Sequence, residues 1–129
     1  MLNPSTADAQ RDDPTIRRCI RFSRDWGWGA LEIVNLYALR ATDPQRLRRH
    51  RDPVGPDNDA HILAAAARNG PTIGAWGAFE VDPLRPARVL AMLGDGVRCL
   101  GLTRAGHPRH PLYAPASARP IRFVAAATL

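Results

Sequence analysis

The stretch ALEIVNLY, residues 30–37, decides the fold class that this sequence predicts. It is a nearly continuous apolar run, which is typical of a strand covered on both faces of its sheet. Two further runs have the same character, TIGAW at residues 72–76 and VRCLGL at residues 97–102. Each run is bounded by glycine or proline, the residues that most often end a strand. The three runs together predict strands of one sheet.

Amphipathic segments with helix start signals separate these runs. Asp13 is placed as an N-cap, with Pro14 at the first helical position. Strands that alternate with helices imply right-handed crossovers and parallel pairing. We therefore expect an α/β domain with three layers, α/β/α, around a short parallel sheet of about four strands. The other expected helices span residues 45–51, 56–69 and 85–93.

The two ends of the chain carry separate expectations. Met1 and Leu2 precede the loop residues NPST, which is the pattern of a strand running into a loop. We therefore expect the first strand to be truncated, with an upstream strand segment missing. A length of 129 residues leaves room for one domain, which we place at residues 1–123, before a tail at 124–129. Residues 114–129 are expected to be loosely structured.

Composition narrows the class of protein. No apolar run approaches the roughly 20 residues that span a bilayer, and no secretory signal opens the chain, which predicts a cytoplasmic protein without a membrane partner. Cys19 and Cys99 are too few for a disulfide framework. All 18 basic residues are arginine and the net charge is +6. Arginine binds phosphates through paired hydrogen bonds, so DNA or a nucleotide is a candidate partner, and an arginine-biased genome is the competing explanation.

Four polar loops follow the expected strands at their carboxyl ends. They comprise residues 3–8, 35–37, 76–77 and 106–111. In open α/β sheets, ligands bind in the crevice outside those ends. Polar residues that interrupt an apolar strand there are costly unless a ligand or partner satisfies them. The convergence of these loops predicts a binding site.

Three side chains of the first two loops are candidates for forming hydrogen bonds with a base or for activating a water molecule. Asn3 precedes a proline, so a stiff turn fixes the direction of its amide. The amide would then position a water molecule or form hydrogen bonds with the edge of a base. The alternative is an Asx-turn that only shapes the loop. Asp8 is a candidate general base. Asn35 interrupts an apolar run with a donor and an acceptor side by side, the pair that reads a pyrimidine edge. Its alternative role is a core amide satisfied by backbone.

The late loop and the basic segments supply the remaining candidates. His107 and His110 each precede a proline that would hold the imidazole against developing negative charge. Two histidines supply only two zinc ligands, so we expect neither a metal nor a cofactor. Phe79 is the candidate for stacking on a base. Arg46, Arg48, Arg49 and Arg109 are candidates for binding phosphates, and the alternative is a solvated basic face.

Several motifs in register resemble a known family. The strings MLNPSTAD, DDPTIRRC, VNLYALRATDP, DPVGPDNDAH, AWGA and CLGLTRAGHPRHPLY are similar to the bacterial domain-of-unknown-function family numbered 1643. The likeness extends from Met1 to about Tyr113. Members of that family usually carry an additional N-terminal segment, in keeping with a truncated first strand. The family assigns no activity.

The order of the motifs also resembles the uracil-DNA glycosylase superfamily. Leu2-Asn3-Pro4 is similar to the loop that positions the attacking water there, although Met1 replaces the glycine that opens that loop. By the same resemblance, Asn35 would read the flipped base. The segment HPRHPL, residues 107–112, looks like the loop whose histidine stabilises the leaving base. One inserted residue leaves both His107 and His110 as counterparts.

The leading hypothesis is a nucleobase-recognising protein of glycosylase-like fold that hydrolyses an N-glycosidic bond in DNA after flipping the base out of the stack. Two alternatives remain open: a non-catalytic nucleotide or nucleic-acid binding module, and an enzyme that acts on a small nucleotide. The strength of binding as a function of salt concentration separates DNA from a small ligand.

Overall fold

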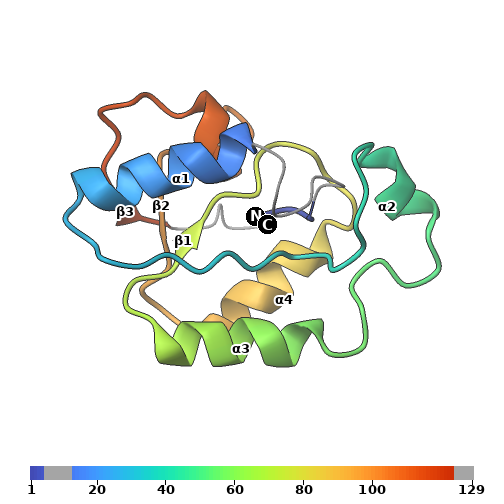
Figure 1. Ribbon diagram of the computed structural model, residues 1–129. Coiled ribbons are helices and arrows are strands. Elements are labelled where there is room, and N and C mark those ends of the chain that lie inside the picture. Colours follow the sequence, from blue (N-terminus) through green and yellow to red (C-terminus); the bar gives the residue numbers. More distant parts are fainter. Residues whose placement is uncertain (5–12, 124–129) are drawn as a thin grey trace.

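Four α-helices and a sheet of three short strands make up the described part of the computed structural model, residues 1–4 and 13–123 (Figure 1). Asp8 and the expected tail at 124–129 lie outside the described residues. In chain order the elements are α1 (Pro14–Asp25), α2 (Gln45–Arg49), α3 (Asn58–Arg68), β1 (Ile73–Gly74), α4 (Leu84–Leu93), β2 (Arg98–Cys99), the 3-10 helix η1 (Pro111–Tyr113) and β3 (Ile121–Arg122).

The helices begin and end close to where the sequence predicts. The Asp13 carboxylate accepts hydrogen bonds from the backbone N–H groups of Thr15 and Ile16 at 2.8 and 3.3 Å, which confirms the predicted N-cap of α1. Gly94 follows α4 with φ +75°, a conformation that glycine adopts without steric cost. Within the described residues, no helix is both long and apolar enough to cross a bilayer.

The sheet is mixed, which corrects the predicted parallel sheet of about four strands. Its order is β1-β2-β3, with β1 parallel to β2 and β3 antiparallel to β2. The predicted strands at 72–76 and 97–102 are present, but each contributes only two residues to the ladder. Ile121 and Arg122 lie in the segment expected to be loose. Both are exposed, so β3 lacks the apolar run by which a buried strand is identified.

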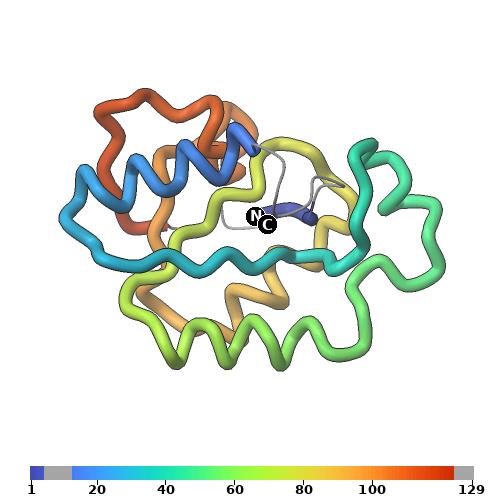
Figure 2. Tube along the Cα trace, viewed as in Figure 1, coloured from blue at the N-terminus to red at the C-terminus, as the bar shows by residue number. Residues whose placement is uncertain are grey.

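Residues 30–37 are not a strand of this sheet, which corrects the expectation on which the fold prediction began. The segment runs as a stretched chain across the molecule (Figure 2). Within the described chain, its backbone forms hydrogen bonds with the backbone of Met1 and Leu2 only. The N–H of Leu36 donates to the Met1 carbonyl and that of Tyr37 to the Leu2 carbonyl, both at 2.9 Å. The Met1 nitrogen donates to the Val34 carbonyl at 3.1 Å.

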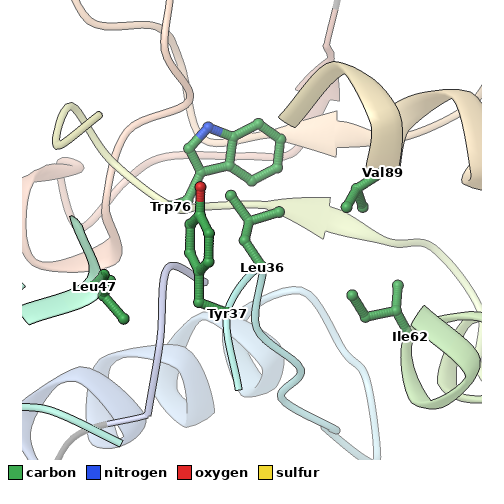
Figure 3. Close-up of a cluster of buried hydrophobic side chains, with 6 residues drawn as sticks. All are labelled: Leu36, Tyr37, Leu47, Ile62, Trp76 and Val89. Carbon is green, nitrogen blue, oxygen red and sulfur yellow. The ribbon is translucent and has the colours of Figure 1, made fainter. Parts of the chain in front are cut away.

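The helices lie on two sides of the strands. Figure 1 shows α1 above them and α3 and α4 below. Phe22 of α1 packs with Leu100 and Ala114 in one buried cluster. The larger cluster brings side chains of α2, α3 and α4 against the stretched segment and Trp76 (Figure 3). Its members are Leu36, Tyr37, Leu47, Ile62, Trp76 and Val89.

Candidate functional site

A cavity of about 600 Å³ lies where four separate segments meet, and we call it the polar cavity. The segments are the chain start, the loop before α2, the loop after β1, and residues 103–113 after β2. Residues of three of the four loops that were expected to converge line it, from 3–8, 76–77 and 106–111, whereas residues 35–37 do not, and the loop before α2 was not among those expected. Its lining residues are Met1, Leu2, Asn3, Thr42, Pro44, Trp76, Gly77, Ala78, Phe79, Thr103, Arg104, Arg109, His110 and Tyr113.

Asn3 is held firmly at one wall of the polar cavity. Its side-chain nitrogen donates to the carbonyls of Leu39 at 3.2 Å and Ala41 at 3.0 Å, and also to that of Pro4 at 3.1 Å. The amide therefore ties the chain start to the loop before α2, which is a structural role. Because these bonds fix the amide plane, they also fix the direction of its oxygen, the acceptor that remains for a ligand or a water.

His110 also lines the polar cavity, and one of its ring nitrogens already accepts a hydrogen bond. The backbone N–H of Leu112 donates to Nδ1 at 3.2 Å, so in the neutral ring the proton is on Nε2. Burial lowers the pKa of His110 and favours this neutral form. Gly77 (φ +80°) lies close to His110. A Cβ at Gly77 would be 3.2 Å from Cβ of His110, so the lack of a side chain at Gly77 gives the histidine room for its observed position. His110 thus offers a hydrogen-bond donor.

Trp76 carries a donor with no partner in the described chain. The residue is 7% exposed, and its buried Nε1 makes no hydrogen bond. The benzo edge of the indole packs on Gly74, where a Cβ would lie 3.0 Å from Cζ3. Figure 3 shows the nitrogen on the side of the ring away from Val89. Trp76 lines both the polar cavity and a second, apolar cavity, whereas Gly74 lines only the apolar one. Since the benzo edge packs on Gly74, we infer that the Nε1 edge lies on the side of the polar cavity. A buried N–H without an acceptor is costly unless a ligand or water completes it.

Two of the predicted phosphate-binding arginines lie at or beside the polar cavity. Arg109 lines it, and its Nε donates to the Leu102 carbonyl at 3.2 Å. The Arg48 guanidinium stacks 4.6 Å above the Phe79 ring and donates to the Glu80 carbonyl, which holds Phe79 at the cavity wall. Arg48 is therefore engaged in supporting an aromatic side chain rather than directed to solvent.

The other predicted site residues lie elsewhere. Asn35 lines a second, apolar cavity of about 560 Å³, while Asn58 binds its backbone carbonyl at 2.9 Å. His107 lines neither cavity, because its backbone closes a tight turn with Thr103. Arg46 and Arg49 extend along α2 outside the cavity lining. The structure therefore brings Asn3, Phe79, Arg109 and His110 together and leaves Asn35 and His107 apart from them.

Sequence reasoning missed several lining residues. Arg104 and Tyr113 flank the late loop, and Tyr113 is 78% exposed. The signal available in the sequence was an aromatic residue directly after the histidine-proline loop. The unpartnered nitrogen of Trp76 has no signal in the sequence, because it depends on which groups surround the indole in the fold. No group of three or more histidine, cysteine or acidic side chains that could hold a metal occurs among the described residues.

Comparison with known proteins places the chain in a family. The model of the family described as "Protein of unknown function (DUF1643)" matches residues 1–112, so the chain belongs to that family. No curated protein and no solved structure matches the chain.

Proposed function

We propose that this member of the DUF1643 family recognises a nucleobase carried by a nucleotide or by DNA, and that the polar cavity is its binding site. The observation that supports the proposal is the gathering of aromatic rings, unsatisfied donors and arginines around one cavity of about 600 Å³. Ligand sites combine an apolar wall with a few placed polar groups in this way.

Aromatic side chains would supply the stacking surface. Phe79 is held by Arg48, and Tyr113 lies against His110 with ring centroids 5.9 Å apart. Stacking of a base on an aromatic ring contributes roughly 1–3 kcal/mol and tolerates any base. Selection among bases then depends on hydrogen bonds.

Two donors are available for that selection. Nε2 of His110 and the unpartnered Nε1 of Trp76 would each donate to a carbonyl oxygen or ring nitrogen of the base. The fixed oxygen of Asn3 would accept from an amino or imide N–H. A base that offers both acceptors and a donor satisfies these groups, whereas a ligand without them leaves buried polar atoms unpaired.

Arginines at the cavity wall would bind the phosphate. Arg104 and Arg109 both line the polar cavity, and the chain carries a net charge of +6. Arg46 and Arg49 on α2 would contact flanking phosphates only if the ligand is a nucleic-acid strand. The number of phosphates bound therefore distinguishes DNA from a free nucleotide.

Hydrolysis of the N-glycosidic bond is the second candidate function, favoured by the neutral state of His110. In this reaction a water oxygen bonds to C1′ while the C1′–N bond breaks and its electron pair leaves with the base; the proton that the water loses passes to solvent, and the departed base takes up a proton. Nε2–H of His110 would stabilise the departing base, and the Asn3 oxygen would orient the water. Asp8, the other candidate to hold the water, lies outside the described residues. Asn35 has no part in this arrangement because it lines the apolar cavity.

Calorimetric titration tests the binding proposal. Uracil, cytosine, adenine and guanine nucleoside monophosphates and a single-stranded oligonucleotide are titrated into the wild type and into two histidine variants. His110→Ala is expected to weaken binding about tenfold, as the loss of one hydrogen bond to a polar ligand implies. His107→Ala, in the same loop but outside the cavity, is the matched control and should bind normally. Binding that is absent, or equally weak in both variants, refutes the proposal.

Release of free base tests hydrolysis separately. The wild type is incubated with single-stranded and duplex DNA that contains uracil or other modified bases, and the products are resolved by chromatography. Base release that disappears in His110→Ala supports hydrolysis. Tight binding without release from any substrate assigns the protein to the non-catalytic alternative.

A further inference from the structure

The second cavity is an apolar groove bordered by two stretched lengths of chain. One border is the segment 30–36 and the other is the segment 70–76, which contains β1. Phe22 of α1 and Trp26, the C-cap of that helix, line it from one side of the sheet, and Ile62 and Ala65 of α3 line it from the other. We call this cavity the strand groove. The strand groove shares Met1 and Trp76 with the polar cavity, but its lining is otherwise different, and the inference below does not rest on the proposed function.

Backbone groups on both borders lack partners. Within the described chain, none of the N–H groups of residues 31–35 donates a hydrogen bond. On the other border, the Thr72 carbonyl accepts from Arg98, and Ile73 pairs with Arg98 in the parallel ladder. In such a ladder, alternate residues direct their backbone groups to opposite sides, so those of Ile73 point away from β2. No residue of the described ranges forms a hydrogen bond with the backbone of Ile73 on that side.

Met1 and Leu2 show how a strand fits between these borders. They run in the same direction as residues 34–37 and exchange backbone hydrogen bonds with Val34, Leu36 and Tyr37. Met1 also lines the strand groove together with Trp76. Traced back from Met1 in the opposite direction to the chain, the line of this strand runs along the groove and passes the unpaired N–H groups of residues 31–34.

We propose that the strand groove binds one extended apolar peptide strand, which pairs in parallel with residues 30–34 on one side and with β1 on the other. Each residue of a strand advances about 3.3 Å, so the groove border of 30–34 matches a strand of about five residues. Because apolar side chains line both faces of the groove, the peptide is apolar on both faces, as central parallel strands are. Addition of a strand to an exposed edge is a common mode of peptide recognition.

Hydrogen exchange measures this pairing directly. The probe is a synthetic peptide with five central valine and isoleucine residues flanked by lysines for solubility. The peptide is added to the full 129-residue protein, and amide exchange is followed residue by residue. By the same alternation, the backbone groups of Glu32 and Val34 point to the side on which Met1 pairs, so we expect the N–H groups of Glu32, Val34 and Ile73 to exchange at least tenfold more slowly. A peptide with proline at the central position cannot donate there and should protect these amides at least threefold less.

The same peptide joined directly ahead of Met1 raises its local concentration and removes weak affinity as a reason for failure. The absence of protection in both the added and the joined form refutes the proposal. Protection that grows with protein concentration without peptide assigns the groove to a second copy of the chain and also refutes it. A fatty acid provides the last outcome. If it binds, removes the protection that the peptide gives and itself leaves the border amides unprotected, the groove is a lipid site and the proposal is refuted.

Discussion

Gly77 provides a stringent test of the polar cavity because one added methyl group perturbs it in a calculable way. Gly77 has φ +80°, and an alanine Cβ there would lie 3.2 Å from Cβ of His110. The left-handed backbone costs a residue with a side chain about 1 kcal/mol, and the close contact adds about 1 kcal/mol more. Gly77→Ala should therefore lower the free energy of unfolding by about 2 kcal/mol.

Gly27→Ala is the matched control for the backbone term. Gly27 has φ +81°, and nothing lies within 4 Å of its added Cβ, so its alanine variant should lose about 1 kcal/mol only. Urea unfolding followed by tryptophan fluorescence measures both losses. Since the contact displaces His110, Gly77→Ala should also bind nucleotide about fivefold more weakly, as the loss of about 1 kcal/mol implies. Equal stability losses in the two variants, or unchanged affinity in Gly77→Ala, would show that Gly77 does not set the position of His110.

Three further predictions concern the fold. Leu47→Ala, at a side chain 1% exposed, should lower the free energy of unfolding by about 2–5 kcal/mol, while Leu84→Ala, 65% exposed, should change it by less than about 0.5 kcal/mol in the same urea titration. Asp59→Asn should cost about 1–3 kcal/mol by thermal unfolding, because it removes the carboxylate 2.7 Å from the buried guanidinium of Arg85; a neutral outcome would mean that the pair adds nothing. Burial lowers the pKa of the Met1 α-amine from 8.0 to about 6, so the unfolded chain binds more protons between these values and stability should rise from pH 6 to pH 8 by about 2–3 kcal/mol. Urea titrations of Nα-acetylated protein should lose that rise, and identical pH profiles would contradict the burial of the amine.

The helices and the convergence of loops could be predicted because their determinants are local. Asp13 followed by Pro14 specifies the start of α1, and Gly94 specifies the end of α4, through backbone chemistry within one turn. The polar loops converge because residues at the ends of neighbouring extended segments meet at one edge. Asn3 and His110 therefore reach the same cavity although 107 positions separate them.

The sheet and the exact membership of the site depend on partners that sequence patterns do not specify. The apolar run at 30–37 has the composition of a strand, yet among the residues that the structure describes only Met1 and Leu2 form backbone–backbone hydrogen bonds with it. β3 forms from an exposed pair of residues because the N–H of Phe123 reaches the Val97 carbonyl at 3.0 Å. Asn35 adjoins Leu36, and neighbouring side chains of a stretched chain point to opposite sides. Leu36 enters the main core and also borders the strand groove, while Asn35 lines the strand groove and not the polar cavity.

The Trp76 indole N–H offers the most direct measurement of nucleobase recognition in the polar cavity. Three indole signals are expected in a nitrogen–proton correlation spectrum of the wild type, from Trp26, Trp28 and Trp76. Addition of a bound nucleoside monophosphate should move the Trp76 signal, because its unpartnered N–H gains an acceptor, and should leave that of Trp26, already bonded to Ala118 at 3.0 Å, in place. A Trp76 signal that stays fixed at saturating ligand, or a change confined to Trp26, would contradict the assignment of the polar cavity as the nucleobase site.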